Sequence, residues 1–123
     1  HGRTVTATDF KYSLQRLASV RSKRSNLIEP ILGAAEAIEA ARSKSEDAPE
    51  IKGIEVLGDL QLRITLKKPY APFIYHLAMV NTAVVPRELV EEHGHAFSRL
   101  PTGTGAFILD EWKEGTSLHL KAN

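Results

Sequence analysis

The sequence predicts an α+β fold, with a small mixed or antiparallel sheet of hairpins and packed helices. Two stretches, about residues 7–20 and 34–42, carry apolar or alanine-rich residues at helical spacing. Two others, 51–66 and 106–121, alternate apolar and polar residues around a glycine-containing turn. The order of helices, hairpin, helices and hairpin favours α+β over a doubly wound parallel sheet.

Length and composition indicate one ordinary globular domain over residues 1–123, with 42% apolar and 25% charged residues. A net charge of +1 gives no reason to expect a nucleic acid or an anionic membrane as partner. The absence of cysteine excludes disulfides, thiolate metal sites and cysteine nucleophiles. No apolar run approaches the roughly 20 residues of a membrane span. Because the chain begins with His1 and its only methionine is Met79, we expect a processed product or a piece of a longer protein.

A capping box at Thr6–Asp9 predicts the start of the first helix, which runs from about Ala7 to Val20. In this motif Thr6 accepts from the N–H of Asp9, and Asp9 accepts from the N–H of Thr6. Residues 21–25 read as a solvated basic loop, and Pro30 limits helix in the apolar run 26–31. Gly33 precedes the second helix, and residues 43–50 form a polar loop.

The clearest strand lies in the first hairpin, with Ile54 and Val56 on one side and Gly58-Asp59 as the turn. Strict alternation predicts that every second residue after the turn faces the core. The inward residues are Leu60, Leu62, Ile64 and Leu66, and the outward ones are Gln61, Arg63 and Thr65.

Downstream, Pro72 suits the first turn of a helix over 71–79. Residues 82–85 suggest a short strand, 87–92 a helical turn or two, and 95–100 irregular backbone. The last hairpin pairs 106–112 with 117–121 through a loop in which Gly115 can take a positive φ. There Leu118 and Leu120 are expected on a buried face.

The motifs that suggest chemistry have simpler structural explanations. Gly103-Thr104-Gly105 leads into a strand, whereas a phosphate loop must open a helix, so a structural turn is favoured. His93 and His95 have metal-ligand spacing for a strand, but loop histidines are favoured. No Gly-x-Ser-x-Gly signature is present, and Trp112 is expected to pack. We therefore assign no catalytic residue, no metal ligand and no cofactor.

Several stretches, taken together and in order, resemble one protein family. Gly2 to Arg16 resembles the DG-x-PVTA-x-D-x-x-YS-x-x-R stretch of solute-binding proteins of the peptide/nickel ABC-importer family, the oligopeptide/dipeptide-binding type. Gly53 to Pro72 looks like the same family's hairpin, and Phe73 to Pro86 continues the resemblance. Pro101 to Gly115 is similar to its P-x-GTGPY-x-L-x-x-W-x-x-G stretch.

Three positions depart from the pattern, and none of them would prevent the fold. His1 stands where Asp is usual, Thr4 where Pro is common, and Ala106 where Pro follows the glycines.

The resemblance implies a piece of the first lobe of a longer, two-lobed periplasmic-binding-protein-like fold: the small inserted subdomain plus the strand that returns to the lobe. It implies a binding component that is not an enzyme and that delivers peptides, or a related small solute, to the membrane permease subunits of an ABC importer. Such a protein is exported and is periplasmic or anchored at the cell surface. A hydrolase domain and a stand-alone interaction module are the alternatives.

Asn81 and Thr82 are the ligand-binding residues that we predict, since they form a polar loop between an apolar helix and an apolar run. A solvent-exposed connection is the alternative explanation for these two residues. Most of the ligand site is expected outside this chain.

Overall fold

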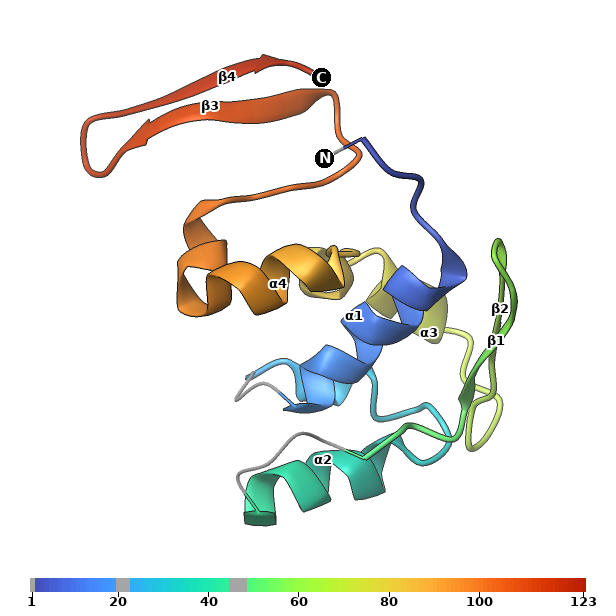
Figure 1. The fold of residues 1–123 in the computed structure, drawn as a ribbon. Coiled ribbons are helices and arrows are strands. Elements are labelled where there is room, and N and C mark those ends of the chain that lie inside the picture. The colour runs from blue at the N-terminus through green and yellow to red at the C-terminus, as the bar shows by residue number, and fades with distance from the viewer. Residues whose placement is uncertain (1, 20–22, 45–48) are drawn as a thin grey trace. The chain divides into compact units, whose positions relative to one another are not determined.

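A computed structural model describes residues 2–19, 23–44 and 49–123. Its contacts divide the chain into two compact units, His1–Val84 and Val85–Asn123, called here the N-terminal and C-terminal units. Each unit contains helices and one separate two-stranded antiparallel sheet (Figure 1). The α+β prediction is therefore confirmed.

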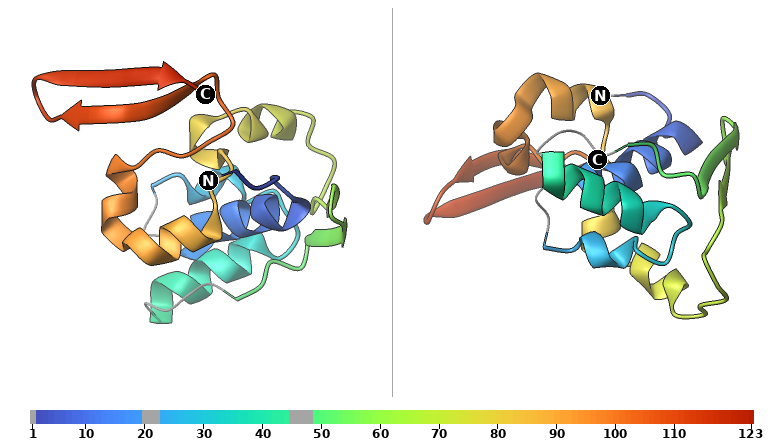
Figure 2. Two further views of the ribbon diagram at one scale, coloured as in Figure 1. Left: turned by 45° about the horizontal axis from the view of Figure 1, so that its top comes forward. Right: turned by 90° about the horizontal axis from the view of Figure 1, so that it is seen from below.

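The helices of the N-terminal unit surround its apolar core. α1 spans Ala7–Ser19, the short 3₁₀ helix η1 spans Ser25–Leu27, and α2 spans Ala34–Lys44. Both predicted long helices are confirmed, while Val20, the predicted end of the first, lies outside the described residues. α1 and α2 lie beside each other in all three views (Figures 1 and 2). The core between the elements contains Leu14, Leu17, Ala18, Ile28, Ile31, Ala34, Ala37, Ile38, Ala41, Ile51, Ile54 and Phe73.

The first hairpin pairs β1, Ile54–Gly58, with β2, Gln61–Ile64. Gly58 pairs with Gln61, so the turn is Asp59-Leu60, one residue later than the sequence suggested. Leu60 therefore sits at the tip and is 80% exposed, and its predicted place in the core is wrong. The rest of the alternation is confirmed: Leu62, Ile64 and Leu66 are half-buried against the core, and Gln61, Arg63 and Thr65 are exposed.

Three chain segments meet at the base of this hairpin in a closed ring of backbone hydrogen bonds. The N–H of Leu32 donates to the carbonyl of Thr65 at 2.9 Å, that of Thr65 to Gly53 at 2.8 Å, and that of Gly53 to Leu32 at 2.8 Å. Beside the ring, Ile31 and Leu66 form an isolated antiparallel bridge. The ring joins the approach to α2 to both strands of the hairpin.

The segment after the hairpin is less regular than predicted. α3 spans only Phe73–Leu77, and the 3₁₀ helix η2 spans Val80–Thr82. The suggested strand at 82–85 is wrong, because Thr82 closes η2 and the described chain pairs no strand with residues 83–86.

The C-terminal unit consists of α4, Arg87–His93, the 3₁₀ helix η3, Gly94–Arg99, and the hairpin of β3, Phe107–Lys113, with β4, Ser117–Ala122. η3 replaces the irregular backbone expected there. The hairpin itself is confirmed, and Gly115 has the expected positive φ, at +72°. The expected buried face is wrong for this chain, because Leu118 and Leu120 are 53% and 54% exposed.

Gly53→Ala is expected to destabilise the N-terminal unit strongly. An added Cβ would lie 2.7 Å from the carbonyl oxygen of Thr65 and 2.8 Å from that of Leu32, and both oxygens belong to the ring. Overpacking of this kind typically costs about 1–3 kcal/mol. We expect the free energy of unfolding, measured by urea unfolding, to fall by about 2 kcal/mol or more.

Gly58→Ala in the same hairpin is the matched control, since nothing lies within 4 Å of its added Cβ. We expect its free energy of unfolding within about 0.5 kcal/mol of the parent sequence. Equal losses for the two variants would contradict the described packing at Gly53.

Candidate functional site

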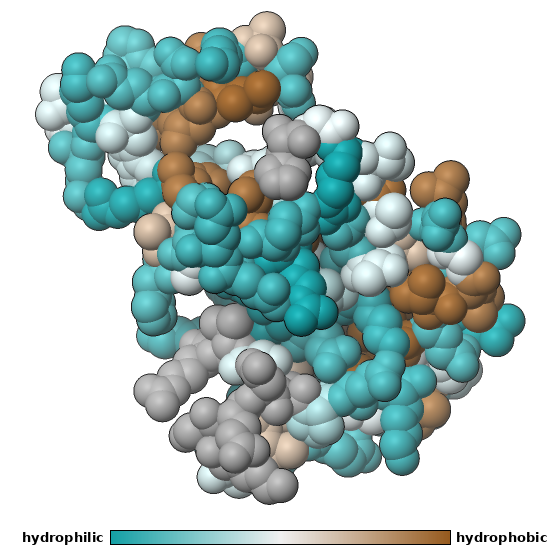
Figure 3. All heavy atoms as spheres, in the orientation of Figure 1, coloured by the Kyte–Doolittle hydropathy of each residue, from teal (hydrophilic) through white to brown (hydrophobic). Residues whose placement is uncertain are grey.

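An apolar groove lies in the N-terminal unit between the start of α1, the β1–β2 hairpin and the end of α3. It encloses about 330 Å³, at the small end of the range for ligand pockets. Hydrophobic side chains gather beside the hairpin in the space-filling view, to the right (Figure 3). The groove is lined by Val5, Thr6, Ala7, Phe10, Leu14, Leu60, Leu62, Ile64, Leu77 and Thr82.

Of the two predicted ligand residues, only Thr82 lines this groove. Thr82 is 6% exposed, and its hydroxyl lies 2.8 Å from the carbonyl of His76 and 2.7 Å from that of Met79. These contacts hold η2 against the end of α3. Asn81 is exposed. Contact of either residue with a ligand stays a prediction.

α3 is held in place by the ring of His76. Its Nδ1 lies 2.8 Å from the carbonyl oxygen of Leu27 in η1. The ring meets Tyr70 edge-on, with centroids 5.6 Å apart, and Phe73 at 6.0 Å. These contacts fix the helix that leads to Thr82, so His76 has a positioning role in the fold of this site.

The segment of residues 70–86 itself contains no Asp, Glu, Lys or Arg. Ile74, Tyr75 and Val80 are 65%, 73% and 83% exposed within it. Such a surface can contact the apolar or uncharged parts of a ligand, but it offers no side chain that pairs with a charged terminus.

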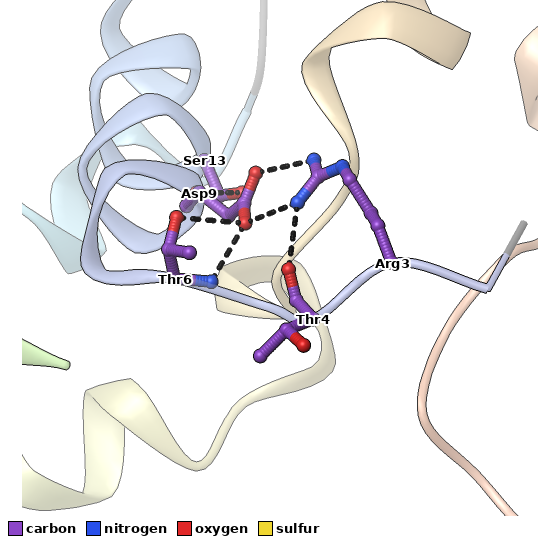
Figure 4. Close-up of polar contacts among 5 residues, drawn as sticks. All are labelled: Arg3, Thr4, Thr6, Asp9 and Ser13. Atoms are coloured by element: carbon purple, nitrogen blue, oxygen red, sulfur yellow. Dashed lines mark hydrogen bonds and ion pairs between the residues drawn. The ribbon is translucent and has the colours of Figure 1, made fainter. Parts of the chain in front are cut away.

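The start of α1 is fixed by a buried carboxylate (Figure 4). Asp9 is 6% exposed, and Arg3 donates two hydrogen bonds to its two oxygens, at 2.7 and 2.8 Å. The backbone N–H of Thr6 donates to Asp9 Oδ2 at 2.8 Å, and the Thr6 hydroxyl lies 3.2 Å from the same oxygen. Arg3 also donates to the carbonyl of Thr4, and Ser13 Oγ to that of Asp9.

The predicted capping box is therefore only half correct. Asp9 does reach back to the N–H of Thr6. The N–H of Asp9, however, donates to the backbone carbonyl of Thr6, because the Thr6 hydroxyl is turned toward the carboxylate. Sequence reasoning missed Arg3, for which the only signal was a basic residue just before a capping box.

The hydrogen bonds from Arg3 are the main cause that lowers the pKa of Asp9 to about 2 from its ordinary 3.8. Burial opposes this shift, and the bond from the Thr6 N–H adds to it. At the surface, the hydrogen bond from Lys11 Nζ lowers the pKa of Glu50 below its ordinary value.

The remaining motifs are spread over different elements. His93 ends α4 and His95 lies in η3, while His119 lies in β4 and Gly103-Thr104-Gly105 leads toward β3. Among the described residues, no cluster of three or more His, Asp or Glu side chains is arranged to hold a metal ion. In the same part of the chain, no helix combines the length and apolarity needed to span a membrane.

Arg3→Gln is expected to raise the pKa of Asp9 and to lower stability at neutral pH. A carboxyl whose pKa is depressed in the folded state contributes stability above its unfolded pKa, 3.8, and loses it as pH falls through about 2. The shift corresponds to about 2 kcal/mol for a buried group. Urea unfolding between pH 2 and 6 measures the free energy of unfolding, and the substitution should remove the larger part of Asp9's contribution to its pH dependence in this window.

Lys11→Gln is the matched control, since it breaks a pair whose acidic partner is solvent-exposed. We expect nearly unchanged stability at pH 7 for this variant. A loss as large as that of Arg3→Gln would mean that the buried position of Asp9 is not what makes its ion pair strong.

Comparison with known proteins covers the whole chain. Residues 1–123 match the family described as "Bacterial extracellular solute-binding proteins, family 5 Middle". The chain is 33% identical to the glutathione-binding protein GsiB of Escherichia coli over 67 residues, 54% of this chain and 13% of that protein. It is 28% identical to the probable D,D-dipeptide-binding periplasmic protein DdpA of Escherichia coli over 99% of this chain and 21% of that protein.

A solved structure gives the same result in three dimensions. The substrate-binding domain of an oligopeptide ABC transporter from Bacillus anthracis superposes with a TM-score of 0.82 at 26% identity. The superposition covers 99% of this chain and 24% of that one. The chain thus spans about a quarter or less of the length of these relatives. Because the family match extends over all 123 residues, the chain belongs to the bacterial extracellular solute-binding proteins of family 5.

Proposed function

We propose that residues 1–123 form part of the first lobe of a longer, two-lobed solute-binding protein of a peptide-type ABC importer. The observation that carries this proposal is the unequal coverage of the solved relative. Nearly all of this chain superposes on it, while about three quarters of that relative has no counterpart here. A single-domain match of this kind is expected from a subdomain of a larger fold.

Peptides are the ligand class that we propose for the whole protein. The names of two relatives support it, one for D,D-dipeptides and one for oligopeptides. Binding and delivery without chemistry is favoured over a hydrolase, because the relatives are binding proteins. It is favoured over a stand-alone interaction module by the family match along the whole chain.

Location and partners belong to the same proposal. We propose that the protein acts outside the membrane, in the periplasm or anchored at the cell surface as a lipoprotein. The periplasmic relative supports this location. The proposed partners are a peptide and the permease subunits of the importer.

Within this chain, the segment of Asn81 and Thr82 is the part proposed to lie near the ligand. It is uncharged and bears exposed apolar side chains, so it would contact ligand side chains rather than termini. A cleft that closes from two sides buries most of its ligand's surface. Half a cleft leaves that surface in contact with water, while the entropic cost of ordering the bound ligand remains. The isolated chain should therefore bind peptides weakly or not at all.

Calorimetry of the isolated chain and of the two-lobed parent with di- to pentapeptides tests this proposal. We expect binding heat from the parent and none from the isolated chain at micromolar peptide. Micromolar binding by the isolated chain would contradict the half-cleft. A parent that binds another solute and no peptide would contradict the ligand class.

Asn81→Ala in the parent tests the predicted contact. Loss of one hydrogen bond to a ligand would raise the Kd about tenfold. Gln61→Ala, an exposed amide on β2, is the matched control and should leave the Kd unchanged. Equal affinities for both variants would remove Asn81 from the site.

A further inference from the structure

We propose that His76 is a positioning residue for ligand binding. Its imidazole, held as the Nδ1–H tautomer by the backbone of η1, sets the place of the Asn81–Thr82 segment. His76 has this role only if that segment lies near a ligand, so the inference rests on the proposed function. It concerns a residue that acts through its neighbours and need not touch the ligand itself.

The hydrogen-bond partner of the ring decides which nitrogen carries the hydrogen. Nδ1 of His76 lies 2.8 Å from the carbonyl oxygen of Leu27. A carbonyl oxygen can only accept, so Nδ1 must donate. Neutral His76 is therefore the Nδ1–H tautomer, and the doubly protonated ring would keep the same bond.

The acceptor belongs to a firmly packed part of the N-terminal unit. Leu27 is 7% exposed, and Ile28, which follows it, is fully buried. Ser25, at the start of η1, is also buried and accepts a hydrogen bond from Arg42 of α2 at 3.3 Å. η1 is thus joined to α2 and to the apolar core, which makes its backbone a fixed point for the imidazole.

The backbone of the same residue holds the proposed ligand segment. The hydroxyl of Thr82 lies 2.8 Å from the carbonyl oxygen of His76, and the N–H of Met79 donates to that oxygen at 3.2 Å. The N–H of Thr82 in turn donates to the carbonyl of Met79 at 2.9 Å. His76 therefore contacts the core through its ring and η2 through its carbonyl. A shift of His76 would move Asn81 and Thr82 with it.

The ring makes two kinds of contact that can be separated by substitution. It meets Tyr70 edge-on at 5.6 Å and Phe73 at 6.0 Å, and a phenyl ring could keep both contacts. A phenyl ring cannot donate to Leu27. The amide of an asparagine can donate from nearly the place of Nδ1, but it loses the aromatic contacts.

The tautomer is tested first, in the 123-residue chain, and this test does not depend on any ligand. Ring ¹⁵N chemical shifts measured at mildly alkaline pH distinguish a protonated from an unprotonated nitrogen. We expect Nδ1 of His76 to be protonated and Nε2 to be unprotonated. The opposite assignment would overturn the proposal, because Nδ1 could not then donate to Leu27.

The effect on binding is tested in the two-lobed parent by calorimetry with di- to pentapeptides, at a temperature where every variant is folded. We expect His76→Phe to raise the Kd by about two- to fivefold, because the segment would spend less time in its binding position. His76→Asn should keep the Kd within about twofold of the parent, since it restores the donor. A merely structural role would lower the thermal midpoint and leave the Kd unchanged in both variants.

His95→Phe is the matched control, since His95 is an exposed histidine in η3, and its Kd should equal that of the parent. An unchanged Kd for His76→Phe would overturn the proposal. So would a Kd for His76→Asn as high as that for His76→Phe, because the ring contacts would then position the segment. Absence of binding heat in the unsubstituted parent would refute the proposed function, and the positioning role with it, whatever tautomer the ring adopts.

Discussion

The ring of backbone hydrogen bonds among Leu32, Gly53 and Thr65 is the constraint on which the N-terminal unit depends. It brings the approach to α2 into register with the hairpin, and Ile31 and Ile54 beside it are among the most deeply buried residues. The close approach of three backbones leaves no room for a side chain at position 53. This crossing fixes the base of the hairpin beside the apolar core.

Asp9 plays the corresponding role at the start of α1. Its buried carboxylate accepts hydrogen bonds from both Arg3 and the backbone N–H of Thr6. These bonds fix the path of the chain that enters the helix. That path sets the positions of three residues that line the groove, Thr6, Ala7 and Phe10. Two sets of polar contacts, the ring of backbone hydrogen bonds and the buried Arg3–Asp9 ion pair, thus hold the elements that border the groove, although the groove's own lining is apolar.

Local patterns predicted the elements, and non-local contacts decided the rest. The periodicity of α1 and α2, the alternation of Leu62, Ile64 and Leu66, and the glycine at 115 depend on neighbouring residues, and all were predicted. The position of Leu60 depended on a one-residue difference in the turn, which alternation alone does not define. The ring at Gly53 joins segments far apart in sequence, and Arg3 lies outside any local pattern. The ligand contact of Asn81 stays a prediction.

The N-terminal unit has a firm backbone crossing, and the hairpin of the C-terminal unit is largely exposed. Residue-resolved hydrogen exchange of the 123-residue chain tests both at once. We predict that the amides of Leu32, Gly53 and Thr65 exchange among the slowest, and that the amides of β3 and β4 exchange much faster. Protection of the hairpin amides equal to that of the ring, or rapid exchange at Gly53, would contradict the account.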